Sequence, residues 1–149
     1  MAKQLTSSIM MIRPVAFRFN EQTAANNYYQ RVLEGLSADQ VQAEACREFD
    51  VFVEKLRAKG VEVVVVEDTS ENDTPDSIFP NNWISFHQDG RVGSYPMYAE
   101  NRRLERREDI LTLLQEQHNF VISEVIDFSH YENEGRFLEG TGSMLLDRM

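Results

Sequence analysis

Two segments of the sequence share one order of predicted elements: an amphipathic helix, a strand, a polar loop and a second apolar strand. In the first segment, a helix over 38–59 leads to a strand over 61–68 and then to DSIFPNNWISF. In the second, a helix over 103–117 leads to a strand over 120–128 and then to GRFLEGTGSMLL. Such self-similarity indicates stacked supersecondary units, each of which needs a neighbour to bury its apolar face. The order of helices and strands predicts a fold of the α/β class.

The first helix is the element that the sequence specifies most strongly. Ser37 and Gln40 form a capping-box pattern, in which a serine N-cap is followed three residues later by a side chain that can bond back to it. Apolar side chains then recur at helical spacing, and Gly60 stands where a C-terminal glycine ends a helix. The unbroken valines of the strand that follows predict burial on both of its faces.

Further strands complete the predicted order. A buried strand over 8–12 comes first, and two short strands over 83–87 and 91–94 flank a QDG turn, which is a hairpin pattern. We expect Asn101 to cap the second helix, and we expect a last strand over 143–147 after a glycine-rich loop.

The sequence stops directly after this last predicted strand, which has no following element to cover it. We therefore interpret residues 1–149 as one partial domain without an internal linker, the N-terminal part of a longer protein. Exposed apolar strands at such a point are expected to favour association.

The composition excludes several classes of protein. Hydrophobic residues are 42% and charged residues 27% of the chain, which are ordinary values for a globular protein. The longest apolar run, 63–66, is far shorter than the roughly 20 residues that a membrane span needs, so we predict no membrane insertion. The net charge of −10 predicts that the chain has no nucleic-acid partner. A single cysteine fits a reducing compartment, so we expect a cytoplasmic protein.

The residues that most often carry chemistry are predicted to be structural here. Cys46 lies in the middle of the helix over 38–59, and no helix N-terminus, cation or histidine in the sequence pattern activates it. His118 ends the second helix, His87 stands beside the QDG turn, and His130 lies in a loop. No pair of histidines has metal-ligand spacing with Cys, Asp or Glu, so we predict no metal site.

Polar residues in three segments are candidates for a binding site, and each also has a structural interpretation. Asn81 or Asn82 could simply shape a turn, or could present an amide to a neutral amide-like or ureido ligand. Glu139 precedes a glycine and lies either in a surface turn or on backbone that approaches a ligand closely. In the second case its carboxylate serves in acid–base chemistry or binds an N–H-rich group. Arg102 lies at a predicted helix start, where the dipole disfavours a cation, so carboxylate binding is the alternative to a solvated face.

Four segments in the same order, IMMIRP, DSIFPNNWISF, YAENRRLERRED and FLEGTGSMLLD, resemble the amidinotransferase and arginine-deiminase superfamily, the pentein fold. Within that superfamily, the chain looks most similar to the arginine-deiminase-related hydrolases of the citrulline-utilisation type. The resemblance implies a five-bladed α/β propeller, of which this chain supplies about the first half. It also implies a hydrolase that acts on a C–N bond in the ureido or guanidino group of citrulline or arginine.

The resemblance assigns a role to four residues. Glu139 matches the acidic residue that partners the catalytic histidine and the substrate nitrogens. Asn82 matches a position where many members carry an aspartate that holds the guanidinium, and Asp76 matches a substrate-binding acid just upstream. Arg102 matches an arginine that binds the substrate carboxylate. The implied mechanism uses a cysteine thiolate as nucleophile and a histidine as acid and base, and it needs no metal or cofactor.

The catalytic cysteine and histidine of that superfamily normally come later in the chain, so we expect them outside these 149 residues and expect the chain alone to be inactive. An asparagine at position 82 cannot form the ion pair that a buried guanidinium requires. The ureido group of citrulline is neutral and needs no such pair, so citrulline is the favoured substrate. Two alternatives stay open: a non-catalytic interaction protein of the same fold, and a truncation product without a function of its own. The expected partner is a small amino-acid substrate, and the sequence leaves open whether the protein forms a homo-oligomer.

Overall fold

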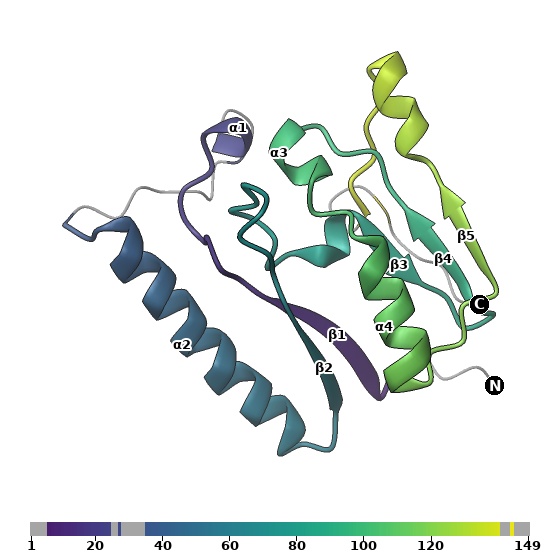
Figure 1. The fold of residues 1–149 in the computed structure, drawn as a ribbon, viewed down its shortest axis with the longest axis horizontal. Helices are drawn as coiled ribbons and strands as arrows, with labels where there is room; N and C mark the ends of the chain where they lie inside the picture. The colour runs from purple at the N-terminus through teal and green to yellow at the C-terminus, as the bar shows by residue number, and fades with distance from the viewer. Residues whose placement is uncertain (1–5, 25–26, 28–34, 141–143, 145–149) are drawn as a thin grey trace. The chain divides into compact units, whose positions relative to one another are not determined.

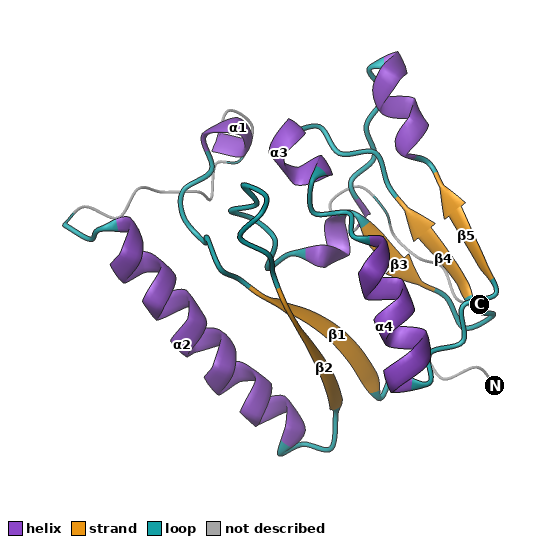
Figure 2. Ribbon diagram, viewed as in Figure 1, coloured by secondary structure: helices purple, strands orange, loops and turns teal. Residues whose placement is uncertain are grey.

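The structure is a computed structural model of the 149-residue chain, and it describes residues 6–24, 27, 35–140 and 144. The described residues form two compact units, one within Met1–Phe79 and the other within Pro80–Leu146. Each unit has its own small sheet and is described by itself (Figure 1). The secondary structure is mixed α and β, as the sequence predicts (Figure 2).

The first unit is built on a parallel strand–helix–strand motif. Strands β1 (Ser8–Arg13) and β2 (Glu62–Glu67) pair in parallel over their full lengths. Helix α2 (Ala38–Arg57) lies between them in sequence, and the short helix α1 (Glu21–Ala24) precedes α2 in the same connection. Both predicted strands are confirmed to within one residue at each end.

Helix α2 begins as the sequence predicts and ends two residues early. The Ser37 hydroxyl accepts from the Gln40 backbone N–H, and the Gln40 side chain accepts from the Ser37 N–H, so the capping box is present. After the helix, Gly60 has a φ of 81°, in the left-handed region that glycine adopts without steric cost. The core of this unit lies under α2, where Phe49 and Val53 pack on the strand residue Val63.

The second unit holds a three-stranded sheet in the order β3-β4-β5. Strands β3 (Ile84–Phe86) and β4 (Arg91–Ser94) form the predicted antiparallel hairpin, while β5 (Glu124–Asp127) pairs in parallel with β4. Helix α4 (Glu108–His118) lies between β4 and β5 in sequence. The second unit therefore also contains a parallel strand–helix–strand motif. Helices α2 and α4 are each followed by a strand, as the predicted repeat requires. The last strand of its second copy lies outside the described residues, so the complete repeat stays a prediction.

The second predicted helix, over 103–117, is divided in the structure. Helix α3 (Glu100–Arg103) ends after one turn, and α4 starts only at Glu108. The N-cap residue of α3 is Ala99, and Asn101 lies inside the helix, so the predicted cap at Asn101 is wrong.

Part of the charge pattern favours the division of this helix. In α3 the arginines lie in the last turn, where a cation is favourable, and α4 has Glu108 and Asp109 in its first turn, where acids are favourable. A continuous helix over 103–117 would instead place arginines at its N-terminus. The division therefore moves Arg102 and Arg103 to a helix C-terminus, although Arg107 remains at the N-cap of α4.

The strand predicted over 120–128 is shortened at its start to β5. Asn119 ends α4 in the left-handed conformation, with a φ of 56°, and the Phe120 N–H donates back to the Leu114 carbonyl. The first residues of the predicted strand thus belong to the end of the helix. After β5, the 3₁₀ helix η2 (Ser129–Glu134) occupies the start of the region predicted as a loop.

Three expectations are not tested by these units. The strand predicted over 143–147 lies outside the described residues, apart from Met144. The two sheets do not by themselves show a propeller, and the single partial domain also stays a prediction.

Among the residues that the structure describes, no helix is long and apolar enough to cross a membrane.

Candidate functional site

Two segments that the sequence analysis singled out lie against each other in the second unit. The 3₁₀ helix η1 (Pro80–Asn82) forms the FPNN turn that precedes β3. Gly140 packs so closely on this turn that a Cβ atom there would stand 2.4 Å from the Asn81 carbonyl oxygen. The same Cβ atom would lie 3.4 Å from the carbonyl oxygen of Asn82. The glycine therefore allows the backbone that follows Glu139 to approach the backbone of the FPNN turn.

Glu139 has a donor or a cation near each of its carboxylate oxygens. One oxygen accepts from the Tyr98 N–H at 3.4 Å, and the other lies 3.8 Å from Nη1 of Arg102. The side chain is 29% exposed, so the carboxylate is accessible although it lies beside a buried cation. Such a carboxylate can accept hydrogen bonds from a nitrogen-rich ligand or exchange a proton with it.

Arg102 is buried in the second unit as part of an ion pair. Its Nε and Nη2 donate to the two carboxylate oxygens of Glu105 at 3.0 and 3.1 Å. The side chains of Arg102 and Glu105 are only 5% and 1% exposed. A bidentate pair of this kind fixes the plane of the guanidinium as well as its charge. The solvated face that was one interpretation of this segment is therefore wrong for Arg102.

Glu132, which the sequence analysis did not single out, organises the backbone next to Glu139. Its carboxylate accepts from Arg106 at 2.5 and 3.0 Å and from the Met97 N–H at 2.8 Å. Arg103 adds hydrogen bonds to the carbonyls of Met97 and Tyr98. These contacts hold the segment whose N–H donates to Glu139. Glu132 lies 26 residues from its arginine partner, and no local pattern signals such a pair.

Asn82 is half-buried in η1, and its Oδ1 accepts from the Asn81 side chain at 3.4 Å. The second unit therefore contains three of the four predicted site residues, namely Asn82, Arg102 and Glu139. The ligand-binding role of the Asn82 amide stays a prediction.

Asp76 belongs to the first unit, where it is 5% exposed. Its carboxylate accepts from Asn20 Nδ2 at 2.7 Å and from the Thr23 hydroxyl at 3.1 Å. Asn20 also caps α1, because its Oδ1 accepts from the Gln22 N–H. Asp76 thus ties its loop to the start of α1, and its predicted role in substrate binding stays a prediction.

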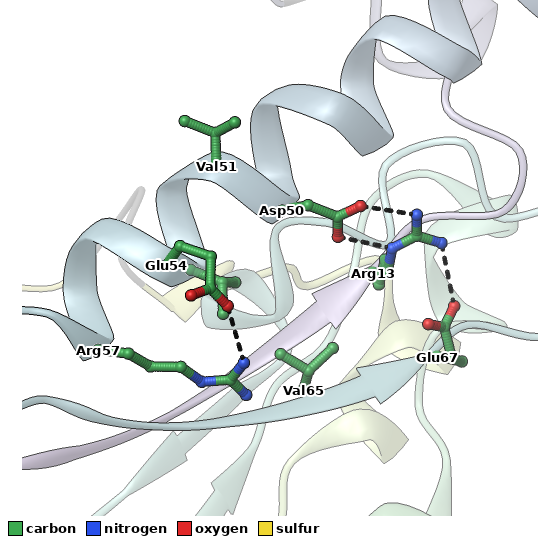
Figure 3. Close-up of a pocket in the computed structure, with 8 residues that line it drawn as sticks. Arg13, Asp50, Val51, Glu54, Arg57, Val65 and Glu67 are labelled. Carbon is green, nitrogen blue, oxygen red and sulfur yellow. Dashed lines mark hydrogen bonds and ion pairs between the residues drawn. The ribbon is translucent and has the colours of Figure 1, made fainter.

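The first unit has an open depression of about 410 Å³, which contains none of the predicted site residues (Figure 3). Arg13 forms a bidentate pair with Asp50 on its rim, and Arg57 pairs with Glu54. The hydrogen bonds from Arg13 hold the pKa of Asp50 below its ordinary value. Because these charges bind one another, the depression has no obvious set of groups to recognise a substrate.

The histidines have the positions that the sequence analysis expects. His118 lies in the last turn of α4, and His87 and His130 are exposed. Within the described residues, no group of three or more His, Cys, Asp or Glu side chains could hold a metal ion.

Cys46 lies on α2 with its sulfur in contact with polar groups. Sγ donates to the Pro14 carbonyl at 3.3 Å and accepts from Gln42 Nε2 at 3.1 Å. The contacts bind the helix to the segment after β1, which is a packing role.

We expect Cys46→Ala to leave kcat/KM of the intact protein within about twofold of wild type, because a packing residue outside the site affects stability more than turnover. Steady-state kinetics with a thermal melt as a fold control measures this. Complete loss of turnover in a folded variant would show that Cys46 takes part in the chemistry.

A comparison with known protein families shows which family the chain belongs to. The family profile for N,N dimethylarginine dimethylhydrolase, eukaryotic, matches residues 13–149. The match assigns the chain to the hydrolases of the pentein superfamily, so that part of the resemblance is confirmed. More narrowly, the chain belongs to the family of eukaryotic N,N dimethylarginine dimethylhydrolases, and the match does not support the citrulline-utilisation hydrolases in particular. Comparisons with curated proteins and with solved structures gave no match.

Proposed function

We propose that the chain is the N-terminal portion of a hydrolase that cleaves a C–N bond in the guanidino or ureido group of an amino acid. The observation that carries this proposal is the partly exposed Glu139 carboxylate, which lies beside a buried arginine in the unit that also contains Asn82. Membership of a family of dimethylarginine hydrolases supports the same class of reaction.

The proposed mechanism is covalent catalysis by a cysteine thiolate. The thiolate attacks the central carbon of the guanidino or ureido group, an amine or ammonia leaves with a proton, and water then releases the product from the sulfur. Glu139 partners the catalytic histidine and holds substrate nitrogens. Asn82 binds the terminal nitrogens, and Arg102 binds the substrate carboxylate. Asp76 is proposed as a substrate-binding acid. No step requires a metal or a cofactor.

We place the nucleophilic cysteine and the acid–base histidine outside the 149 residues. Cys46 is engaged by Pro14 and Gln42 in a packing role, and it is the only cysteine of this chain. The three histidines lie at a helix end or on the surface. The residues described here thus supply binding and positioning groups. A cytoplasmic location and a homo-oligomeric state remain proposals.

Two substrates are candidates within this class. The family name gives N,N-dimethylarginine, which carries a cationic guanidinium, and we propose it as the principal substrate. Citrulline is the second candidate, because the Asn82 side chain is an amide, which matches a neutral ureido group better than a cation. A non-catalytic interaction protein is the remaining alternative.

Turnover by the intact protein tests this proposal. N,N-dimethylarginine, arginine and citrulline are supplied separately, and the released dimethylamine or ammonia is measured with the amino-acid product. We expect release of dimethylamine from N,N-dimethylarginine. If none of the three compounds is turned over, the proposed hydrolase activity is contradicted and the non-catalytic interaction protein is favoured.

We expect Asn82→Asp to shift the ratio of kcat/KM for arginine over citrulline toward arginine by about 1–3 kcal/mol, because an aspartate pairs with the cation. The neighbouring variant Asn81→Asp provides the comparison, since Asn81 is exposed in the same turn. An unchanged ratio in Asn82→Asp contradicts the assignment, and a shift in Asn81→Asp alone moves the binding role to Asn81.

A further inference from the structure

The buried pair of Arg102 and Glu105 is unusual for the segment in which it lies. The stretch from Glu100 to Asp109 is rich in charge, and its other charged side chains are at least partly exposed. Among the charged residues of this stretch, Arg102 and Glu105 alone are buried, at 4% exposure each. Because burying two charges is costly even when they pair, their position calls for a reason beyond local stability.

The geometry of the pair directs Arg102 toward Glu139. Glu105 occupies the Nε and Nη2 side of the guanidinium at 3.0 and 3.1 Å. The other terminal nitrogen, Nη1, lies 3.8 Å from a Glu139 oxygen, which is longer than a hydrogen bond. Arg102 is therefore close enough to influence Glu139, while its two contacts with Glu105 orient the guanidinium.

We infer that Glu105 is a positioning residue, which holds Arg102 in a fixed plane and keeps this cation from closing on the Glu139 carboxylate. The inference rests on the proposed function, in which Glu139 must remain available to the histidine and the substrate nitrogens. Without the Glu105 charge, the Glu139 carboxylate, 3.8 Å from Nη1, attracts the buried guanidinium more strongly. Arg102 then forms a contact ion pair with Glu139 and withdraws it from the reaction.

The test uses the intact protein and the isosteric variant Glu105→Gln. We expect kcat to fall about tenfold or more while the far-UV circular dichroism stays that of wild type, because Glu139 is withdrawn in the reacting complex. Glu100→Gln is the matched control, since Glu100 is exposed on the same short helix. It is expected to keep the kcat and KM of wild type.

A double variant separates positioning from a merely structural role. In Arg102→Met/Glu105→Met both charges are replaced by apolar side chains of similar length, so no cation remains to close on Glu139. We expect kcat to recover to near that of wild type, with KM raised because Arg102 no longer binds the substrate carboxylate. A structural role for Glu105 would not produce this recovery.

The outcomes are distinct. Wild-type kcat in folded Glu105→Gln, or a double variant with kcat no higher than that of Glu105→Gln, overturns the inference and leaves the proposed function standing. Absence of turnover in the wild-type protein overturns both. If Glu105→Gln does not fold, Glu105→Asp replaces it, because the shorter carboxylate cannot keep both contacts to Arg102. Its kcat is expected about threefold or more below that of wild type, and an unchanged kcat overturns the inference.

Discussion

Glu139→Gln is expected to abolish turnover of every guanidino and ureido substrate by the intact protein while the fold is retained. Glutamine has the same shape, and its amide oxygen can still accept the Tyr98 N–H that bonds Glu139. It carries no charge and cannot exchange a proton at neutral pH. Loss of an acid–base group typically costs about 10²- to 10⁴-fold in rate, and Glu139 is proposed to hold substrate nitrogens as well.

Steady-state kinetics of Glu139→Gln, together with thermal melting, measures this effect. Glu134→Gln is the matched control, because Glu134 is exposed and forms an ion pair at the surface with Arg136. The control is expected to behave as wild type. If folded Glu139→Gln retains about a tenth or more of the wild-type kcat/KM, Glu139 is not the catalytic carboxylate.

Gly140→Ala is expected to lower the free energy of unfolding by about 1–3 kcal/mol, toward the upper end of the range. A Cβ atom at position 140 would stand 2.4 Å from the Asn81 carbonyl oxygen, and this neighbour is backbone that cannot swing aside. The turn or the segment after Glu139 must then shift. Because the shift begins next to the proposed catalytic carboxylate, kcat is expected to fall together with stability.

Urea unfolding of wild type and Gly140→Ala gives the change in free energy. Gly135→Ala offers a contrast, since Gly135 has a positive φ of 68° and no atom within 4 Å of an added Cβ. Its expected cost is the conformational one alone, about 1 kcal/mol, without loss of kcat. Equal destabilisation by the two variants would show that the contact with Asn81 is not tight.

The sequence predicts those parts of the fold that depend on local patterns. The capping box of Ser37 and Gln40 defines the start of α2, and the valine run defines β2, because both signals lie within a few residues. The division between α3 and α4 could not be predicted in this way. It accompanies the burial of Arg102 and the pairing of Arg106 with Glu132, and neither the burial nor a contact 26 residues away has a local signature.

The sequence predicts the candidate site only in part. The glycine after Glu139 indicated backbone that approaches a ligand closely, which stays a prediction. In the structure this glycine lies against the Asn81 carbonyl. The residue pattern raised the ligand-binding roles of Asn82 and Arg102 as alternatives, the resemblance made them specific, and both stay predictions. The importance of Glu105 was not predicted, because a glutamate among arginines on a helix usually faces solvent.

The parallel pairing of β1 with β2 has a consequence for how the first unit folds. Ser8 pairs with Glu62, so the two strands meet only after the intervening chain has closed on itself. Closing such a loop costs entropy before any strand contact compensates, whereas α2 with its capping box depends on neighbouring residues alone. We therefore expect the helix to form early and the sheet to close late. In the interval, the valine edge of β2 is open to pairing with other chains, so refolding yield should fall as protein concentration rises.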